Sequence, residues 1–520
     1  MQASSRSLFV TGFSGATVLL IITLAFRIVL NGPFLPEIAA GKIFAAVPGE
    51  VESQAVLILG AFAKYLTVLG SATVIAALYG LYSILFTKLG ERLLFTGAVG
   101  KGLIFSLPVW LIHSSVVYGL DGIYFTTPLV ETLTLLLIAH LAYGAVMSTV
   151  YPKPPVEKRV AEEERETVIV RQEQRDRRMR RIFIRRIAPA AIGVAILIYG
   201  IDRFLLPLLT GRSVVGGSLQ EIYAKEVTPV DEFYRTDIDL IPPSVDSSTW
   251  NLTVNGEVEK PITFTYEEFK SLPQVKEYAT LECISNTVGG PLIGTALWEG
   301  VHLSTVLEKA GIKPLARYVV FYSVDGYSVA IPLERALKEG TILAYTMNDE
   351  PLNSIHGFPL RAIVPGIYGM MNAKWIQRIE LVANEYLGYW QSRGWSNTAE
   401  IETTSVIRVL PPNITLKETT PIAGIAFAGD RGITKVEVSV DDGKTWSDAL
   451  RKDPLSKYTW ILWAKEWIPS EEGLHTVTVR ATDGNGQVQT AQLRGTFPDG
   501  ATGYHAVDVL VKPAAEKQVR

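Results

Sequence analysis

Residues 280–287 read Thr-Leu-Glu-Cys-Ile-Ser-Asn-Thr, and Cys283 within this stretch is the only cysteine of the 520-residue chain. A chain with one cysteine has no internal disulfide and no zinc or iron–sulfur site built from several thiolates. The residues before Cys283 resemble a strand, and those after it lead to the turn-forming pair Gly289-Gly290. A cysteine between a strand and a polar turn is typical of a reacting group. The alternative is an inert buried thiol.

Apolar sequence is concentrated in the first 207 residues, which hold nearly all the long apolar runs. A helix needs about 20 residues to cross the hydrocarbon core of a bilayer. Five runs meet that length, near residues 8–30, 55–87, 93–118, 127–150 and 187–207. We therefore predict an N-terminal all-α transmembrane bundle of four helices within 1–150 and a fifth helix over 187–207. The first run is too long for a signal-peptide core, so we expect it to be retained.

Basic residues set the predicted orientation in the membrane. The arginine-rich segment 175–186 and the loop 88–92 belong on the cytoplasmic side, whereas the connections 31–54 and 119–126 carry little positive charge. This pattern predicts a multi-pass protein of the cell membrane with a cytoplasmic N-terminus, and it places everything after residue 207 outside the cytoplasm. The formal net charge of -3 argues against a nucleic-acid partner.

The charged cytoplasmic linker, 151–186, ends in a motif of its own. Residues 180–185 read Arg-Arg-Ile-Phe-Ile-Arg before an apolar run, which resembles a twin-arginine export signal with Met179 where Ser or Thr is usual. Such a signal directs folded domains across a membrane and would suit a domain that loads its cofactor in the cytoplasm. The alternative is a charged linker that only sets topology.

The outer part of the chain has two predicted domains. Residues 215–404 alternate strands with short helices, an α+β pattern. The expected strands there are 251–256, 317–323, 361–365 and 376–383, and the expected helices begin at Tyr266 and cover 303–310. Helical patterns end near 405. Short strands at 422–427, 434–440 and 476–481 then predict an all-β, immunoglobulin-like sandwich over 405–512.

Four separated segments carry a family resemblance. They are Phe-Tyr-Arg at 233–235, Leu-Glu-Cys-Ile-Ser-Asn at 281–286, His-Gly-Phe-Pro-Leu-Arg at 356–361, and Pro-Gly-Ile-Tyr-Gly at 365–369 running on to Lys374-Trp375. In this order and spacing they resemble the sulfite oxidase family of molybdopterin enzymes. The resemblance continues through 405–512, which is similar to the family's dimerisation domain. It covers most of 220–512 and none of the membrane part.

The resemblance implies that Cys283 is the metal ligand. Molybdenum held by a dithiolene cofactor needs one soft protein thiolate, and binding to a metal deprotonates the thiol. A single cysteine is therefore sufficient for this chemistry.

The resemblance also implies a set of cofactor-binding residues. Arg361 and Lys374 are suited to the phosphate of the pterin, as a bidentate group and a point charge, and Asn372 and Ala373 would offer backbone N–H groups. The full set is Tyr234, Arg235, Ser323, His356, Arg361, Asn372, Ala373 and Lys374. Each also has a purely structural interpretation, such as core packing for Tyr234 or a surface ion pair for Arg235.

The substrate is left open by the sequence. Arg235 is the obvious cation for an oxyanion near the metal, because no Lys or Arg follows Cys283 before Lys309. Tyr327 could supply a phenolic donor, and the alternative is that it only shapes a turn. Sulfite and a sulfoxide are both retained as candidate substrates.

The electron route is open as well. His113 and His140 lie in apolar runs, and such histidines are candidate ligands for a haem b. They fall about 5 and about 13 residues from the predicted outer ends of their helices, a depth difference of roughly 12 Å. A bis-histidine haem needs both ligands near one level, so we expect instead a separate electron carrier, a cytochrome or a quinone-linked protein.

We therefore expect a membrane-anchored molybdenum oxidoreductase that transfers two electrons and one oxygen atom, with a homodimer through 405–512. Two alternatives remain. One is a non-catalytic receptor or binding protein on a degenerate scaffold of this family. The other is a transporter with an accessory outer domain, although its membrane part has few polar residues for a substrate path.

Overall fold

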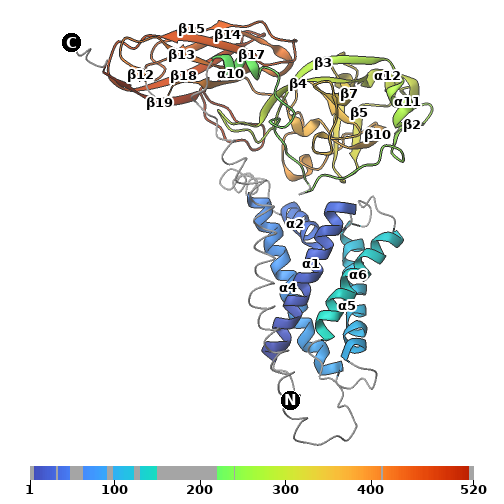
Figure 1. Cartoon of the computed structure of the whole chain (residues 1–520). Helices are drawn as coiled ribbons and strands as arrows, with labels where there is room; N and C mark the ends of the chain where they lie inside the picture. The colour runs from blue at the N-terminus through green and yellow to red at the C-terminus, as the bar shows by residue number, and fades with distance from the viewer. Residues whose placement is uncertain are drawn as a thin grey trace, which may run out of the picture. The chain divides into compact units, whose positions relative to one another are not determined.

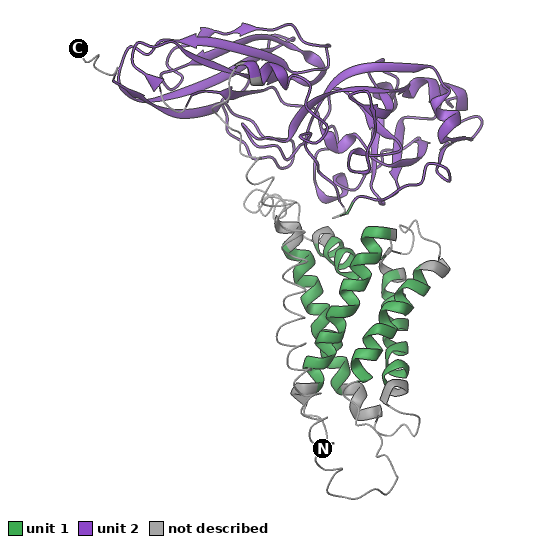
Figure 2. Cartoon of the chain, viewed as in Figure 1, with its two compact units in different colours: residues 1–46, 59–211, 239–241 green, residues 47–58, 212–238, 242–520 purple. Residues whose placement is uncertain are grey.

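The structure, a computed structural model, describes residues 5–30, 33–46, 62–90, 98–121, 129–148, 219–238, 241–411 and 414–513. The chain divides into two compact units (Figure 2). Unit 1 comprises residues 1–46, 59–211 and 239–241, and unit 2 comprises 47–58, 212–238 and 242–520. The predicted linker, the twin-arginine motif and the fifth membrane helix lie outside the described residues.

Unit 1 is helical in its described part (Figure 1). Its helices are α1 (Ser5–Leu30), α2 (Leu35–Ala46), α4 (Phe62–Gly90), α5 (Ala98–Asp121) and α6 (Leu129–Ser148). Helix α1 packs against α4 and α6, and α5 packs against α6. Glycines allow α5 and α6 to pack closely, since a Cβ on Gly102 would lie 2.3 Å from the carbonyl oxygen of Gly144.

Two of these helices are long and apolar enough to cross a bilayer. They contain Leu8–Val29, with mean hydropathy 2.1, and Leu66–Ile84, with mean hydropathy 1.5. The apolar segments Gly102–Val117 and Thr132–Ser148 are shorter. Two such helices among the described residues do not establish a membrane bundle, because core helices of water-soluble proteins share these properties. Spanning therefore stays a prediction.

Helix α2 was not predicted. It falls within 31–54, which the sequence suggested was a connection, and its 12 residues are too short to register as a spanning run. It carries Glu37, which forms a buried ion pair of 2.8 Å with Arg27 on α1.

The first domain of unit 2 contains two sheets. One has the strand order β2 (Ile262–Thr265), β1 (Asn251–Gly256), β10 (Ile376–Val382), β5 (Tyr318–Ser323) and β6 (Ser328–Pro332). The other has the order β3 (Gln274–Glu282), β4 (Ile293–His302), β7 (Ile342–Met347) and β8 (Glu350–Pro351), with β9 (Arg361–Ile363) paired to β7. The helices are α11 (Tyr266–Lys270), α12 (Leu303–Ala310) and α13 (Leu333–Ala336), with short 3₁₀ turns η3 (Ser354–His356), η4 (Gly369–Met371) and η5 (Gln391–Arg393). Helix α10 (Leu219–Ala224) precedes them in the chain and packs against strands of the second domain.

The second domain of unit 2 is built from strands. One sheet has the order β11 (Thr404–Val409), β13 (Thr420–Phe427), β17 (Ile461–Trp467) and β16 (Leu450–Arg451). The other has the order β12 (Ile414–Thr415), β19 (His505–Lys512), β18 (Gly473–Asp483), β14 (Ile433–Ser439) and β15 (Ser447–Asp448), and the 3₁₀ turn η6 (Gly429–Arg431) precedes β14. Ile422, Trp463 and Val477 share one buried core between the sheets. The β-rich prediction is confirmed, and the immunoglobulin-like class stays a prediction.

The two domains of unit 2 share buried residues. Val406 and Phe427 of the β-rich domain belong to the same core as Ile367 and Tyr368 of the first domain. Tyr368 also accepts a hydrogen bond on its hydroxyl from the backbone N–H of Glu402, at 3.2 Å. The β-rich domain is therefore part of the support of the first domain rather than a separate appendage.

Candidate active site

Cys283 follows directly on the last residue of β3. Its backbone N–H donates to the carbonyl of Leu292 at 2.9 Å, and its carbonyl accepts from the N–H of Asn286 at 2.9 Å. The side-chain oxygen of Asn286 in turn accepts from the N–H of Leu292 at 3.0 Å. These bonds close the loop between β3 and β4 and fix the position of the thiol, which is free and only 6% exposed.

Two hydroxyl groups contact the sulfur. Ser285 Oγ lies 3.0 Å from Cys283 Sγ, and Thr236 Oγ1 lies 3.7 Å from it. Two phenol groups belong to the same environment. Burial raises the pKa of Tyr234 well above its ordinary value, and the charge of Cys283 and other neighbours contributes. Burial likewise raises the pKa of Tyr327, with a smaller contribution from Cys283. Both phenols therefore stay protonated.

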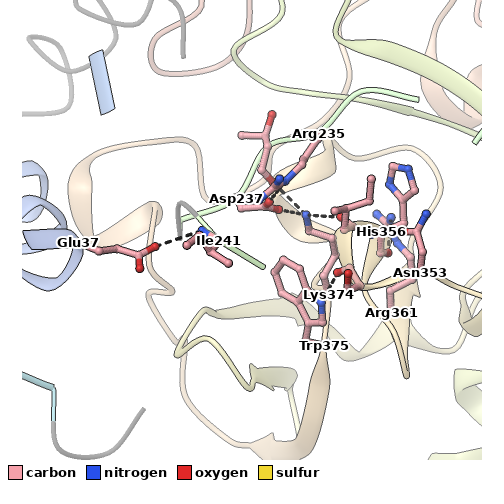
Figure 3. A network of polar contacts seen from close by, with 12 residues as sticks. Glu37, Arg235, Asp237, Ile241, Asn353, His356, Arg361, Lys374 and Trp375 are labelled. Carbon is pink, nitrogen blue, oxygen red and sulfur yellow. Dashed lines mark hydrogen bonds and ion pairs between the residues drawn. The ribbon is translucent and has the colours of Figure 1, made fainter. Parts of the chain in front are cut away.

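The predicted cations Arg235 and Lys374 meet at a carboxylate. Both form ion pairs with Asp237, whose side chain is 2% exposed (Figure 3). Lys374 Nζ also donates to the backbone carbonyls of Thr236 at 3.3 Å and Ile355 at 3.4 Å. Sequence reasoning missed Asp237, because a lone aspartate in the segment after Arg235 carries no sign of a partner more than a hundred residues away.

Arg361 is buried without a carboxylate partner among the described residues. It lies on β9, is 5% exposed, and donates from Nη1 to the carbonyl of His356 at 3.0 Å. Its guanidinium carbon lies 4.8 Å from the ring centre of Trp298, and its Nε has no hydrogen-bond partner within the described ranges. Burial lowers the pKa of Arg361 to about 10. Burying a guanidinium without a counter-charge costs desolvation free energy, which a bound anion would offset.

His356 closes the 3₁₀ turn before Arg361. Its Nε2 lies 2.8 Å from the carbonyl of Val230, so Nε2 carries the proton and donates. Burial lowers the pKa of His356 to about 4, so the ring is neutral at pH 7. The next residue, Gly357, has φ 112°, and a Cβ there would lie 3.0 Å from the Lys374 side chain and 3.1 Å from that of Arg361. A glycine is therefore needed where these chains converge.

Two residues of the predicted set have hydrogen-bond partners within the protein. The backbone N–H of Asn372, which ends the turn η4, donates to the carbonyl of Gly369 at 3.0 Å. Its side-chain oxygen accepts from the N–H of Val364 at 2.6 Å. Tyr327 donates its hydroxyl proton to the carbonyl of Met370 at 2.6 Å, so this phenol positions η4 and is not a free donor here.

Ser323 and Ala373 complete the predicted set. Ser323 ends β5, is 2% exposed, and its Oγ has no hydrogen-bond partner among the described residues. The carbonyl of Ala373 accepts from the N–H of Ala362 on β9 at 2.8 Å, which ties the Lys374 segment to the strand of Arg361.

The β-rich domain reaches the cysteine loop, which sequence reasoning also missed. Arg408 on β11 donates to the carbonyl of Gly290 at 2.9 Å and to that of Gly289 at 3.5 Å. Glu282, beside the cysteine, accepts from the side chain of Asn286 at 2.9 Å. Burial raises the pKa of Glu282 to about 7, and the hydrogen bond from Asn286 and the charge of Arg408 oppose that rise.

These residues fit a molybdopterin cofactor. The cofactor needs one soft thiolate, which Cys283 supplies, and a cationic place for its phosphate, which the unpaired Nε of Arg361 and the nearby Lys374 offer. No group of three or more His, Cys, Asp or Glu in the described part of the chain could hold a metal ion by side chains alone. A single thiolate suits a metal whose remaining ligands come from the cofactor.

Comparisons with known proteins agree with this geometry. The family of oxidoreductase molybdopterin binding domains matches residues 239–390, and that of Mo-co oxidoreductase dimerisation domains matches 396–509. A sulfite oxidase of Arabidopsis thaliana is 32% identical over 289 residues, covering 45% of this chain and 72% of the relative.

Two further relatives extend the comparison. An uncharacterised oxidoreductase, YuiH, of Bacillus subtilis is 34% identical over 155 residues, covering 30% of this chain and 76% of the relative. The mitochondrial sulfite oxidase of Macaca fascicularis is 28% identical over 342 residues, covering 55% and 62%. The expectation of an enzyme is thereby confirmed, and this chain belongs to the sulfite oxidase family of molybdopterin-dependent oxidoreductases.

Proposed function

We propose that this enzyme is anchored in the cell membrane, that its catalytic domain lies outside the cytoplasm, and that it transfers one oxygen atom to or from a small sulfur compound. The observation that carries the proposal is the site around Cys283. The free thiol is buried, two hydroxyls lie against its sulfur, and the buried Arg361 has no carboxylate partner in the described part of the chain. The apolar lengths of α1 and α4 support the anchor.

The residues have separate roles in this proposal. Cys283 is the protein ligand of the metal, and Arg361 with Lys374 holds the cofactor phosphate. His356, neutral and held by the carbonyl of Val230, carries the backbone carbonyl that accepts a hydrogen bond from Arg361. When bound, the molybdenum cofactor supplies two-electron oxygen-atom transfer. The protein holds that cofactor, and burial of the site excludes water from it.

Sulfite is the first candidate substrate, because two of the relatives are sulfite oxidases. One observation favours a neutral sulfoxide as the second. Arg235, the cation expected to attract an oxyanion, is paired with the buried Asp237. Asp237 also pairs with Lys374, so it offsets part of the positive charge of Arg235. A partly offset charge attracts an anion less strongly, whereas a sulfoxide oxygen needs only a hydrogen-bond donor.

The test is metal analysis of the full chain purified in detergent, for the wild type and Cys283→Ser. We expect close to one molybdenum per wild-type chain and a strong loss in the variant, because a hydroxyl is a far poorer ligand for a soft metal. Sulfite oxidation and sulfoxide reduction, each assayed with artificial electron carriers, then separate the two substrates.

Wild-type protein without molybdenum, from a host that loads other molybdenum enzymes, would contradict the proposal. That result would favour the alternative of a non-catalytic binding protein on the same scaffold. Equal molybdenum content in the wild type and in Cys283→Ser would contradict the assignment of Cys283 as the metal ligand, and it would leave the rest of the proposal standing.

A further inference from the structure

A cluster of titratable side chains lies inside unit 1, outside the site described above. Tyr79 of α4, His113 of α5 and His140 of α6 are 7%, 3% and 0% exposed. Tyr79 Oη lies 2.8 Å from His113 Nδ1 and 2.9 Å from His140 Nε2. The two imidazole rings are 4.9 Å apart between centres.

This geometry corrects the depth difference inferred from the sequence. His113 lies eight residues before the end of α5, and His140 lies eleven residues after the start of α6. At this end α5 continues three residues beyond its apolar run of 93–118, and α6 begins two residues after the start of its run of 127–150. The expected separation of roughly 12 Å along the axis therefore shrinks to about 5 Å.

The hydrogen bonds fix every proton in the cluster. His140 Nδ1 lies 2.7 Å from the carbonyl of Leu136, which only accepts, so Nδ1 carries a proton. In the neutral ring His140 Nε2 is then an acceptor, and Tyr79 donates to it. The single hydroxyl hydrogen of Tyr79 is therefore donated to His140, so the bond between Tyr79 and His113 must be donated by His113 Nδ1 to the tyrosine oxygen.

One ring nitrogen of the cluster, His113 Nε2, takes part in none of these hydrogen bonds. In neutral His113 the remaining nitrogen, Nε2, is an acceptor, and it is buried without a hydrogen-bond partner among the residues that the structure describes. A ring whose other nitrogen donates a fixed hydrogen bond is held in one tautomer and one orientation, as in binding sites that use imidazole as the acceptor. A buried acceptor without a partner is costly, which points to a ligand.

The chemistry of the cluster limits that ligand. Neither nitrogen of His140 is open, so the two histidines do not present a pair of ligands for a haem iron. The described residues supply no third side chain for a metal ion. One acceptor needs one donor. The ring of Tyr143 packs against Tyr79, and that of Phe105 packs against Tyr143, so the surroundings are largely aromatic. A hydroxyl on an apolar, planar molecule meets these conditions.

We propose that His113 Nε2 accepts a hydrogen bond from the hydroxyl of a lipid-soluble hydroquinone. The inference rests on the proposed function in one respect, because a membrane location is what brings such a ligand to α5. It names the electron partner that a two-electron oxidoreductase in a membrane would use. Binding itself does not depend on molybdenum.

The test is a binding titration of the detergent-purified full chain with 2-heptyl-4-hydroxyquinoline N-oxide, a hydroquinone analogue whose fluorescence is quenched in a site. We expect one saturable site per wild-type chain. His113→Leu should weaken binding about tenfold or more, the loss of one buried hydrogen bond. Tyr79→Phe, which keeps His113 but releases its tautomer, should weaken binding by a smaller factor.

Tyr143→Phe is the matched control. The Tyr143 hydroxyl donates to the backbone carbonyl of Tyr79 at 3.4 Å, and the variant keeps the aromatic ring and both histidines, so binding should match the wild type. Molybdenum content, measured on the same samples, separates a failure of this site from a failure of the proposed function. Equal affinities of wild type, His113→Leu and Tyr79→Phe would overturn the proposal. A haem absorption band that disappears in His113→Leu would overturn it in favour of haem.

Discussion

At the scale of single residues, the site combines a buried thiol, two hydroxyls beside its sulfur and a buried arginine. Cys283 could be singled out from its sequence surroundings, whereas Tyr234, His356 and Arg361 were expected from the family resemblance. The pairing of Arg235 and Lys374 with one carboxylate was hidden, because an ion pair between segments 137 residues apart leaves no local pattern. The hydroxyls beside the sulfur were hidden for the same reason, since Ser and Thr are ordinary turn residues.

Ser285 provides a prediction at this scale. Once Cys283 binds a metal as a thiolate it can only accept, so the hydroxyl 3.0 Å away must donate. Hydrogen bonds to a ligating sulfur make the site easier to reduce. Ser285→Ala should therefore lower the midpoint potential of the metal. A bond of about 1 kcal/mol corresponds to about 40 mV for one electron.

The measurement is a redox titration of the metal signal, with Ser285→Thr as the control because it keeps the hydroxyl. Thr236→Val should have a smaller effect, since its oxygen is 3.7 Å from the sulfur. An unchanged potential in Ser285→Ala at full molybdenum content would show that this hydroxyl does not act on the sulfur.

At the scale of elements, local patterns predicted much of unit 2. The expected helix 303–310 is α12, and the expected strands 251–256, 317–323 and 376–383 correspond to β1, β5 and β10. Strand β4 was missed, because Ile293–His302 is buried on both faces and contains glycines, so it does not alternate. The contact of β11 with the cysteine loop depends on tertiary packing, which no local pattern encodes.

Arg408 on β11 therefore gives a prediction at the element scale. Its two bonds to the carbonyls of Gly289 and Gly290 hold the loop that carries Cys283. Arg408→Met should cost about 1.5–3 kcal/mol of stability, typical of hydrogen bonds from a charged group, and should reduce molybdenum content. Thermal unfolding and metal analysis measure the two effects.

The control is Arg494→Met. Arg494 pairs with Glu402 at 2.7 Å, but both side chains are 38% exposed, and such pairs contribute little. We expect its molybdenum content and unfolding temperature to stay close to the wild type. If Arg408→Met behaved like this control, the β-rich domain would have no part in supporting the active site.

At the scale of the whole molecule, the order of the domains could be predicted from the sequence, and family comparison confirmed the nature of two of them. The placement of the chain in a membrane is predicted from apolar length and from the distribution of arginines. Orientation follows from which side the basic segments occupy, a property of the chain in its bilayer rather than of its internal packing.

Topology is therefore the prediction for the whole chain, tested by proteolysis of intact spheroplasts and of lysed membranes. The arginine-rich segment 175–186 should resist trypsin in intact spheroplasts and be cut after lysis, because it faces the cytoplasm. The region after 207 should be open to protease in both. Exchange of Arg180 and Arg181 for lysine should reduce its exposure in intact cells if twin-arginine export is used. Cleavage at 175–186 in intact spheroplasts, with the later region protected, would reverse the proposed orientation and place the molybdenum site in the cytoplasm.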